Sequence, residues 1–176
     1  MVKAAAVVTG DGSELQSLID GLFFGEIPDF TVSAVVATER GSRALARSES
    51  AGIPGYEVDA AIFPNAATFT RALTAKLLDL DADIAILVGV EPEPEEGLYR
   101  AFAGRCVCLR IARGADTVSA AAVLADADGS EARRYGRVSA EVKPGDSVSQ
   151  LRRRLVESGA GELLTKALKD YMREFH

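Results

Sequence analysis

Apolar and polar positions along the chain predict strands and helices in alternation. Near-continuous apolar runs at 2–10 ("VKAAAVVTG") and 83–90 ("DIAILVGV") are typical of strands buried on both faces of a parallel sheet. Further strands are expected at 31–38, 55–59 and 106–112. Apolar residues at helical spacing predict helices over 13–24, 41–51, 65–80 and 96–103. The alternation is typical of an α/β fold with a mostly parallel sheet.

The pattern changes in the last third of the chain. Residues 117–126 and 136–143 both look like strands with no helix between them, which predicts an antiparallel hairpin. Two helices then close the chain; Asp146 or Ser147 is expected to cap the first, and the stretch 159–161 separates the pair. A leucine stripe on these helices suits either the core or a dimer interface, with the core favoured: Leu151, Leu155, Leu163, Leu164 and Leu168. Without a repeat or linker, residues 1–176 are expected to form a single domain.

Charge and composition narrow the class of protein. The chain has a formal net charge of -6 and a pI near 4.9, which argues against a nucleic-acid or anionic-membrane surface. No apolar run reaches the length of a bilayer span, and the N-terminus does not read as a signal peptide. Cys106 and Cys108 are two apart with no ligand partners nearby, so neither a disulfide nor a metal site is expected. We expect a reduced, cytoplasmic protein.

The count of histidines excludes several mechanisms. The chain contains one histidine, His176, and it is the last residue. A mechanism that needs a buried imidazole as acid, base or metal ligand is therefore not expected.

The stretch "VVTGDGSELQSLID" (7–20) places a glycine-rich turn between the first strand and the first helix. A strand, a G-x-G turn at Gly10 and Gly12, and a helix capped by Ser13 can direct backbone N–H groups at a phosphate. Asp11 and Glu14 compete for the same N–H donors and repel a dianion. From the residues alone, a structural turn is favoured over a phosphate site.

Several segments together resemble the phosphoribosylglycinamide formyltransferases. The resemblance is carried by "AVVTGDGSELQSLIDG", by "AGR" at 103–105 before the strand "CVCLRI", and by "VKPGDSVSQLRRRLVESGAGELLTKAL". It implies a Rossmann-like, three-layer formyltransferase fold with an antiparallel hairpin near the C-terminal end. It also implies a transferase of one-carbon metabolism in purine biosynthesis that uses 10-formyltetrahydrofolate.

The residues that carry the chemistry of that family differ here. The resemblance places Cys108 and Arg110 where the family has its catalytic Asn and His. Asp128, followed by a glycine, matches the family's catalytic Asp with a small shift. The family's folate-facing stretch is replaced by the acidic segment 91–96 ("EPEPEE"), and most of the family's long segment after the His is missing.

Three hypotheses follow. The first is a diverged formyltransferase-fold protein, a pseudoenzyme without formyl transfer or cofactor, that keeps a small-ligand cleft. Its cleft residues are predicted to be Gly10, Asp11, Gly12, Ser13, Glu14, Gly89, Val90 and Arg110. The second is an active folate-dependent formyltransferase of purine biosynthesis, and the third is a scaffolding or regulatory subunit, for example a homodimer.

We make more specific predictions for two side chains near the expected cleft, Arg110 and Cys108. Arg110 is expected to face the cleft and either to pair with Glu14 or Asp128 or to bind an acidic ligand, with the ion pair favoured. Cys108, close to this cation, is a candidate for a thiol of lowered pKa, although buried strand cysteines are usually inert.

Overall fold

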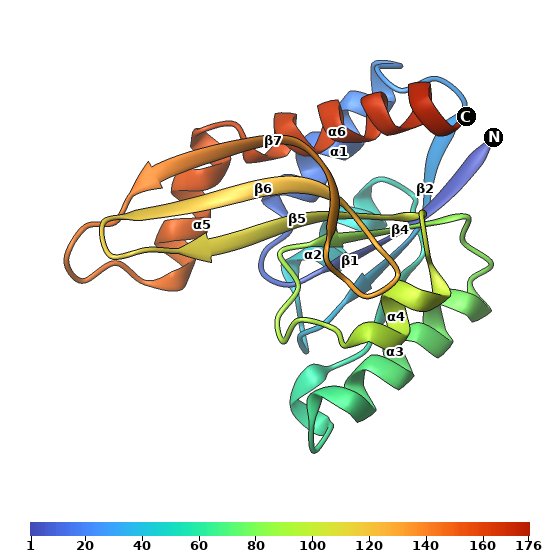
Figure 1. Cartoon of the computed structure of the whole chain (residues 1–176), viewed down its shortest axis with the longest axis horizontal. Coiled ribbons are helices and arrows are strands. Elements are labelled where there is room, and N and C mark those ends of the chain that lie inside the picture. Colours follow the sequence, from blue (N-terminus) through green and yellow to red (C-terminus); the bar gives the residue numbers. More distant parts are fainter.

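The computed structural model describes all residues from 1 to 176 and contains one seven-stranded sheet covered by helices (Figure 1). The strands are β1 (Val2–Val8), β2 (Phe30–Ala37), β3 (Gly55–Glu57), β4 (Ile84–Val88), β5 (Cys106–Arg113), β6 (Thr117–Ala125) and β7 (Glu131–Glu141). The helices are α1 (Ser13–Phe23), α2 (Arg43–Ser50), α3 (Ala66–Asp79), α4 (Glu96–Ala101), α5 (Val148–Glu157) and α6 (Ala160–Phe175). A short 3-10 helix, η1 (Ala60–Ile62), was not expected from the sequence.

The strand order is β3-β2-β1-β4-β5-β6-β7. The pairs from β3 to β5 are parallel, whereas β5-β6 and β6-β7 are antiparallel, so the sequence prediction of a terminal hairpin is confirmed and extended by one strand pair. The chain runs outward from β1 to β2 and β3 and then returns to place β4 on the other side of β1. The carboxyl ends of β1 and β4 therefore meet at a topological switch point, where α/β folds place their ligands.

Two hydrophobic cores lie on opposite faces of the sheet. In β1, Ala4, Ala6 and Val8 contribute to the core that contains α1, α5 and α6, whereas Ala5 and Val7 contribute to the core under α3 and α4. This alternation explains the continuous apolar run, because both faces of the strand are buried. Figure 1 shows α1 and α6 on one side of the sheet and α3 and α4 on the other. The leucine stripe on α5 and α6 is buried, which confirms the core assignment.

The caps agree with the sequence prediction at one helix and differ at another. Ser147 caps α5 and forms a reciprocal capping box with Gln150. Ser13 does not cap α1, which corrects the prediction: Gly12 is the N-cap, with φ 79°. The Ser13 backbone and hydroxyl instead both donate to Asp11 Oδ1, so the carboxylate replaces the serine as acceptor in this turn.

The polar stretch before β7 is shorter than expected. The strand begins at Glu131 rather than near 136, and a register shift between Ala122 and Val123 accommodates the longer ladder. None of the helices combines the length and the apolar character that crossing a membrane requires.

Candidate functional site

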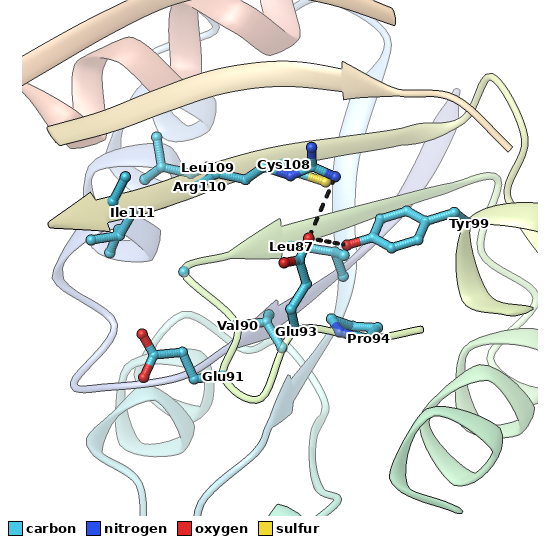
Figure 2. A pocket seen from close by; sticks show the side chains of 12 residues that line it. Leu87, Val90, Glu91, Glu93, Pro94, Tyr99, Cys108, Leu109, Arg110 and Ile111 are labelled. Atoms are coloured by element: carbon cyan, nitrogen blue, oxygen red, sulfur yellow. Dashed lines mark hydrogen bonds and ion pairs between the residues drawn. The ribbon is translucent and has the colours of Figure 1, made fainter. Parts of the chain in front are cut away.

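A cavity of about 450 Å³ opens at the carboxyl ends of β4 and β5, beside the switch point (Figure 2). Its lining residues are Leu87, Gly89, Val90, Glu91, Glu93, Pro94, Tyr99, Cys108, Leu109, Arg110, Ile111 and Ala112. Three of the residues predicted for the cleft, Gly89, Val90 and Arg110, thus line it. The predicted residues of the turn 10–14 do not.

Two backbone donors of the glycine-rich turn are occupied by carboxylates of the chain itself. The Gly10 N–H donates to Glu39 Oε1 at 3.2 Å, and the Ser13 N–H donates to Asp11 Oδ1 at 3.0 Å. The turn keeps the form of an anion-binding nest, and two of its N–H donors are taken up by carboxylates of the chain.

Arg152 of α5 lies between this turn and the cavity. Its guanidinium donates to the carbonyl oxygens of Thr9 and Gly89, both at 2.8 Å, and it lies 3.8 Å from a Glu91 carboxylate oxygen. At Gly89 the φ angle is +55°, and an added Cβ would lie 2.8 Å from Arg152 Nη1. The close approach of this arginine therefore requires a residue without a side chain at Gly89.

The sequence prediction missed Arg152, which stands in the run "RRR" at 152–154. A signal was present, because Arg152 follows Leu151 and precedes Leu155 by three positions, and both leucines face the core. Arg153, one position further, is exposed. Helical spacing can therefore distinguish an inward-facing arginine from its outward-facing neighbour.

Glu14 is buried, with 3 % of its surface exposed. Burial raises the pKa of this carboxyl, and the nearby positive charge of Arg152 partly opposes the rise. The ion pair of Arg110 with Glu14 or Asp128 that the sequence suggested is wrong, because Arg152 is the cation near Glu14, while Arg110 pairs elsewhere.

Arg110 projects from β5 across the cavity wall toward Glu93 and Tyr99 (Figure 2). One Nη donates to the carbonyl oxygen of Gly129, and the same nitrogen lies 3.8 Å from Glu93 Oε1. Its Nε is buried and has no hydrogen-bond acceptor. The Tyr99 hydroxyl donates to Glu93 Oε1 at 3.3 Å, and the centre of the guanidinium lies 5.6 Å from the Tyr99 ring centroid. Burial raises the pKa of Tyr99 well above its usual value, so it remains a neutral phenol.

The two cysteines lie side by side on β5, with their sulfur atoms 3.7 Å apart. Both are free thiols and both are buried. The hydrogen bond from Cys106 lowers the pKa of Cys108, with a further contribution from Arg110, whereas the same contact and burial raise the pKa of Cys106. No cluster of three or more histidine, cysteine or acidic side chains is arranged to hold a metal ion.

Asp128 lies in the turn between β6 and β7 and does not line the cavity. Its carboxylate accepts hydrogen bonds from the backbone and the hydroxyl of Ser130, at 2.9 and 2.6 Å, and these bonds lower its pKa. The turn contacts the site through Gly129, where an added Cβ would meet the Tyr99 ring at 2.8 Å. The carboxylate expected to serve in catalysis is thus engaged in forming the turn.

The sheet order, the helices on both faces and the switch-point cavity define a Rossmann-like α/β fold. Within this class, the chain has the fold of the glycinamide ribonucleotide transformylases, also called phosphoribosylglycinamide formyltransferases. The structure of glycinamide ribonucleotide transformylase 1 from Symbiobacterium toebii superposes with a TM-score of 0.80 at 22% identity, over 99% of this chain and 89% of that one. The sequence itself matches no protein-family model and no curated protein.

Two further solved structures show the same fold. Glycinamide ribonucleotide transformylase 1 from Geobacillus kaustophilus gives a TM-score of 0.74 at 18% identity, over 97% of this chain and 98% of that one. Phosphoribosylglycinamide formyltransferase from Brucella melitensis gives 0.73 at 19% identity, over 97% and 95% of the two chains. The fold expected from the sequence is confirmed, and at these identities the likeness concerns the fold.

Proposed function

We propose that this protein is a diverged formyltransferase-fold protein that does not transfer formyl groups and that binds a small ligand in the cavity beside β4 and β5. The observation that carries the proposal is the internally filled phosphate turn. Its N–H groups at Gly10 and Ser13 donate to carboxylates of the chain, and Arg152 is held by the carbonyl oxygens of Thr9 and Gly89.

A phosphate at this turn would meet the carboxylates of Asp11 and Glu14, which belong to the turn itself. Glu14 is buried and Asp11 is fixed by two bonds from Ser13, so neither can turn away without breaking local structure. If they stayed in place, each would repel a phosphate oxygen at contact distance by roughly 1–4 kcal/mol. A substrate recognised through its phosphate is therefore disfavoured.

The side chains at the two positions that the resemblance assigns to catalysis are poor substitutes for the family's residues. Arg110 stands where the resemblance places a catalytic histidine, and a guanidinium remains protonated at any working pH. Cys108, in the position of the asparagine, is a buried thiol that cannot donate as an amide does. Loss of one member of a concerted catalytic group costs several orders of magnitude in rate, and here two are replaced.

The cavity nevertheless keeps the properties of a binding site. Its volume of about 450 Å³ is within the range of small-molecule sites, and its wall combines apolar side chains with a few charged groups. Residues 114–116 form a tight connection between β5 and β6, closed by a bond from the Gly114 N–H to the Thr117 carbonyl. No long segment covers the cavity at this connection, so a ligand can enter from solvent.

A formyl-transfer assay tests the proposal directly. Glycinamide ribonucleotide and 10-formyltetrahydrofolate are the substrates, and the Symbiobacterium toebii enzyme, named a glycinamide ribonucleotide transformylase, is the positive control. We expect turnover at least about a thousandfold below that of the control. Turnover comparable to the control would instead establish an active folate-dependent formyltransferase.

The binding half of the proposal needs a separate measurement. Nucleotides, folates and small acids are screened by thermal shift, and the hits are mapped by backbone amide chemical shifts. We expect shifts at Val90, Tyr99 and Ile111, which line the cavity, and none at Gly12 in the filled turn. Shifts confined to the turn would contradict the proposed location.

A scaffolding role is the second candidate, and one observation favours it. Phe23 and Phe24 at the end of α1 are 83% and 77% exposed and stack edge to face. Exposed aromatic pairs of this kind are frequent at protein interfaces. Sedimentation over a range of concentrations tests self-association, and Phe23→Ser is expected to abolish any dimer that uses this surface.

A further inference from the structure

The guanidinium of Arg110 has donors that the protein does not use. A guanidinium carries five N–H groups; that of Arg110 donates to the Gly129 carbonyl oxygen and lies near the Tyr99 hydroxyl and the Cys108 thiol. The Nε is buried without an acceptor, and the nearest carboxylate oxygen, on Glu93, is 3.8 Å away. The Nη groups are therefore the donors of Arg110 that a ligand on the cavity wall can reach.

The second arginine of the region differs in this respect. Arg152 donates to two carbonyl oxygens at 2.8 Å, and its side chain is 13% exposed. It supports the ends of β1 and β4 and does not line the cavity. Arg110, with a side chain 29% exposed, is thus the cation that a ligand in the cavity can reach.

The group next to Arg110 can be displaced. Glu93 is 67% exposed, and its carboxylate is fixed by one long hydrogen bond from the Tyr99 hydroxyl and the 3.8 Å approach of Arg110. Ion pairs of this exposure contribute little to stability. Glu93 can therefore turn toward solvent and give up its place beside the guanidinium.

We propose that the cavity binds a small carboxylic acid with an apolar body, whose carboxylate accepts from Arg110 in the place of Glu93. This inference rests on the proposed ligand-binding function of the same cavity. A planar carboxylate suits the fork of a guanidinium, and it can accept from the Nη groups on the cavity side once Glu93 has moved away. The apolar body contacts the side chains that line the rest of the wall, Leu87, Val90, Leu109 and Ile111.

The charges around the cavity favour a single negative charge over a double one. Glu91 and Glu93 lie on the rim, and both are largely exposed to solvent. Their field opposes a phosphate dianion more than a monocarboxylate, while solvent screens it partly for both. The polar group that anchors the ligand is therefore a carboxylate, and the apolar wall makes the cavity selective for the body of the ligand.

Matched acid and amide probes test the inference. Benzoate, phenylacetate and 3-phenylpropionate are titrated into the protein beside benzamide, phenylacetamide and 3-phenylpropionamide, which have the same bodies without the charge. We expect at least one acid to saturate below about 10 mM, with its amide weaker by about tenfold or more. The Nε–H resonance of Arg110 is expected to shift with the acid and not with the amide.

Two variants are expected to change the affinity for the acid in opposite directions. Glu93→Gln removes the competing charge and keeps an acceptor for Tyr99, so we expect the acid to bind about threefold more tightly. Arg110→Lys keeps the charge but loses the fork, and we expect binding weaker by about tenfold. Arg113→Lys, on the exposed end of the same strand, is the matched control and leaves binding unchanged. Thermal unfolding of each variant verifies that it is folded.

Three results would overturn the inference: equal binding of acid and amide, weaker binding in Glu93→Gln, or no acid binding below about 10 mM. Weaker binding of the acid in Glu93→Gln would show that Glu93 supports the site and does not compete with the ligand. If the acids fail while another small molecule shifts the cavity amides, and formyl transfer stays absent, the proposed function stands without the carboxylate. Turnover in the formyl-transfer assay would refute the proposed function whatever the probes show.

Discussion

Arg152 Nη2 donates a hydrogen bond of 2.8 Å to the carbonyl oxygen of Gly89, although 63 residues separate the two along the chain. The contact joins α5, near the C-terminus, to the end of the central strand β4. It places a positive charge at the switch point, where parallel α/β folds commonly bind anions. In this chain the charge is used internally, where it joins the loop after β4 to the end of β1 through the carbonyl oxygens of Gly89 and Thr9.

Replacing Arg152 by methionine should destabilise the protein. The change keeps the apolar part of the side chain but leaves the carbonyl oxygens of Thr9 and Gly89 without their partner. We expect the free energy of unfolding to fall by about 1–3 kcal/mol, measured by urea denaturation at pH 7.

The neighbouring arginine supplies the control for this experiment. Arg153 is exposed, and its replacement by methionine should change the free energy of unfolding by no more than about 0.5 kcal/mol. Equal effects of the two substitutions would show that the bonds of Arg152 contribute nothing specific.

Glu14 should make stability depend on pH in the direction of a buried acid. The ordinary pKa of a glutamate carboxyl is 4.5, and burial raises the pKa of Glu14 in the folded state. Below the pKa that Glu14 has in the unfolded state, its carboxyl is protonated in both states. As pH rises through the higher pKa of the folded state, the folded protein bears the cost of a buried charge. Glu14→Gln should therefore raise the melting temperature at pH 7.5, and its advantage should vanish near pH 4.

The matched control is Glu49→Gln on α2, where the carboxylate is exposed and makes no hydrogen bond. Its melting temperature should follow that of the unchanged protein at every pH. A lower melting temperature for Glu14→Gln at pH 7.5 would mean that the Glu14 carboxylate stabilises the turn more than its burial costs.

Periodicity was sufficient to predict the order of strands and helices, because each apolar stripe must face one of two cores. The partners of charged side chains were not predictable in the same way. Arg110 lines the cavity, and its contacts with Gly129 and Glu93 depend on how the β6–β7 turn and the acidic loop fold over β5. Asp11 and Glu14 already indicated that the turn 10–14 does not bind phosphate. The cation beside the turn, Arg152, was not predicted because it lies on α5, which only the tertiary fold brings there.

Local chemistry also misled the prediction at one position. A serine after a glycine turn is a favoured N-cap, but at Ser13 the preceding Asp11 is a stronger acceptor and lies within reach. Gly12 then takes the cap position with a positive φ, which serine adopts at a cost. When two side chains so close in sequence can both accept the hydrogen bond, the geometry of the turn decides which one does, and residue preferences alone do not predict it.

Gly161 permits the close packing of α1 and α6, and its replacement by alanine should be destabilising. An added Cβ would lie 2.2 Å from Ser17 Oγ and 2.4 Å from Ser17 Cβ, so the helices must move apart. We expect a loss of about 1–3 kcal/mol in the free energy of unfolding, despite the better helix propensity of alanine.

A double variant and a second glycine test this explanation. Ser17→Gly removes the clashing atoms, so the double variant should be more stable than the sum of the single effects by about 1 kcal/mol or more. Gly97→Ala in α4, where nothing lies within 4 Å of the added Cβ, should be neutral or stabilising. Strict additivity of the Gly161 and Ser17 changes would contradict the packing argument.

Asp146 should stabilise the protein at neutral pH and lose this effect in acid. Hydrogen bonds from Arg154, followed by one from the Lys143 N–H, lower the pKa of Asp146 from 3.8 to about 2. Because the pKa of Asp146 is lower in the folded state, the carboxylate stabilises the fold fully above the pKa of the unfolded state. This stabilisation is lost as pH falls through the pKa of the folded state. Asp146→Asn should thus be less stable at pH 7, with the difference shrinking between pH 3.8 and about 2.

Urea denaturation at pH 7, 3 and 2 measures this convergence. Asp116→Asn is the control, since its carboxylate is exposed and makes no hydrogen bond, and it should show no comparable pH-dependent difference. A difference between Asp146→Asn and the unchanged protein that stays constant down to pH 2 would assign its effect to the turn rather than to the charge.

Alkylation should distinguish the two cysteines of β5. Cys108 lines the cavity, and the hydrogen bond from Cys106, with help from Arg110, lowers its pKa, whereas the pKa of Cys106 is raised by the same contact and by burial. Because the thiolate is the reactive form, iodoacetamide should modify Cys108 with a preference of about tenfold or more, measured by peptide mass spectrometry. Cys106→Ala removes the hydrogen bond and should slow labelling of Cys108, while Cys106→Ser keeps a donor and should slow it less. Preferential labelling of Cys106 would mean that reagent reaches β5 through an opening of the core rather than through the cavity.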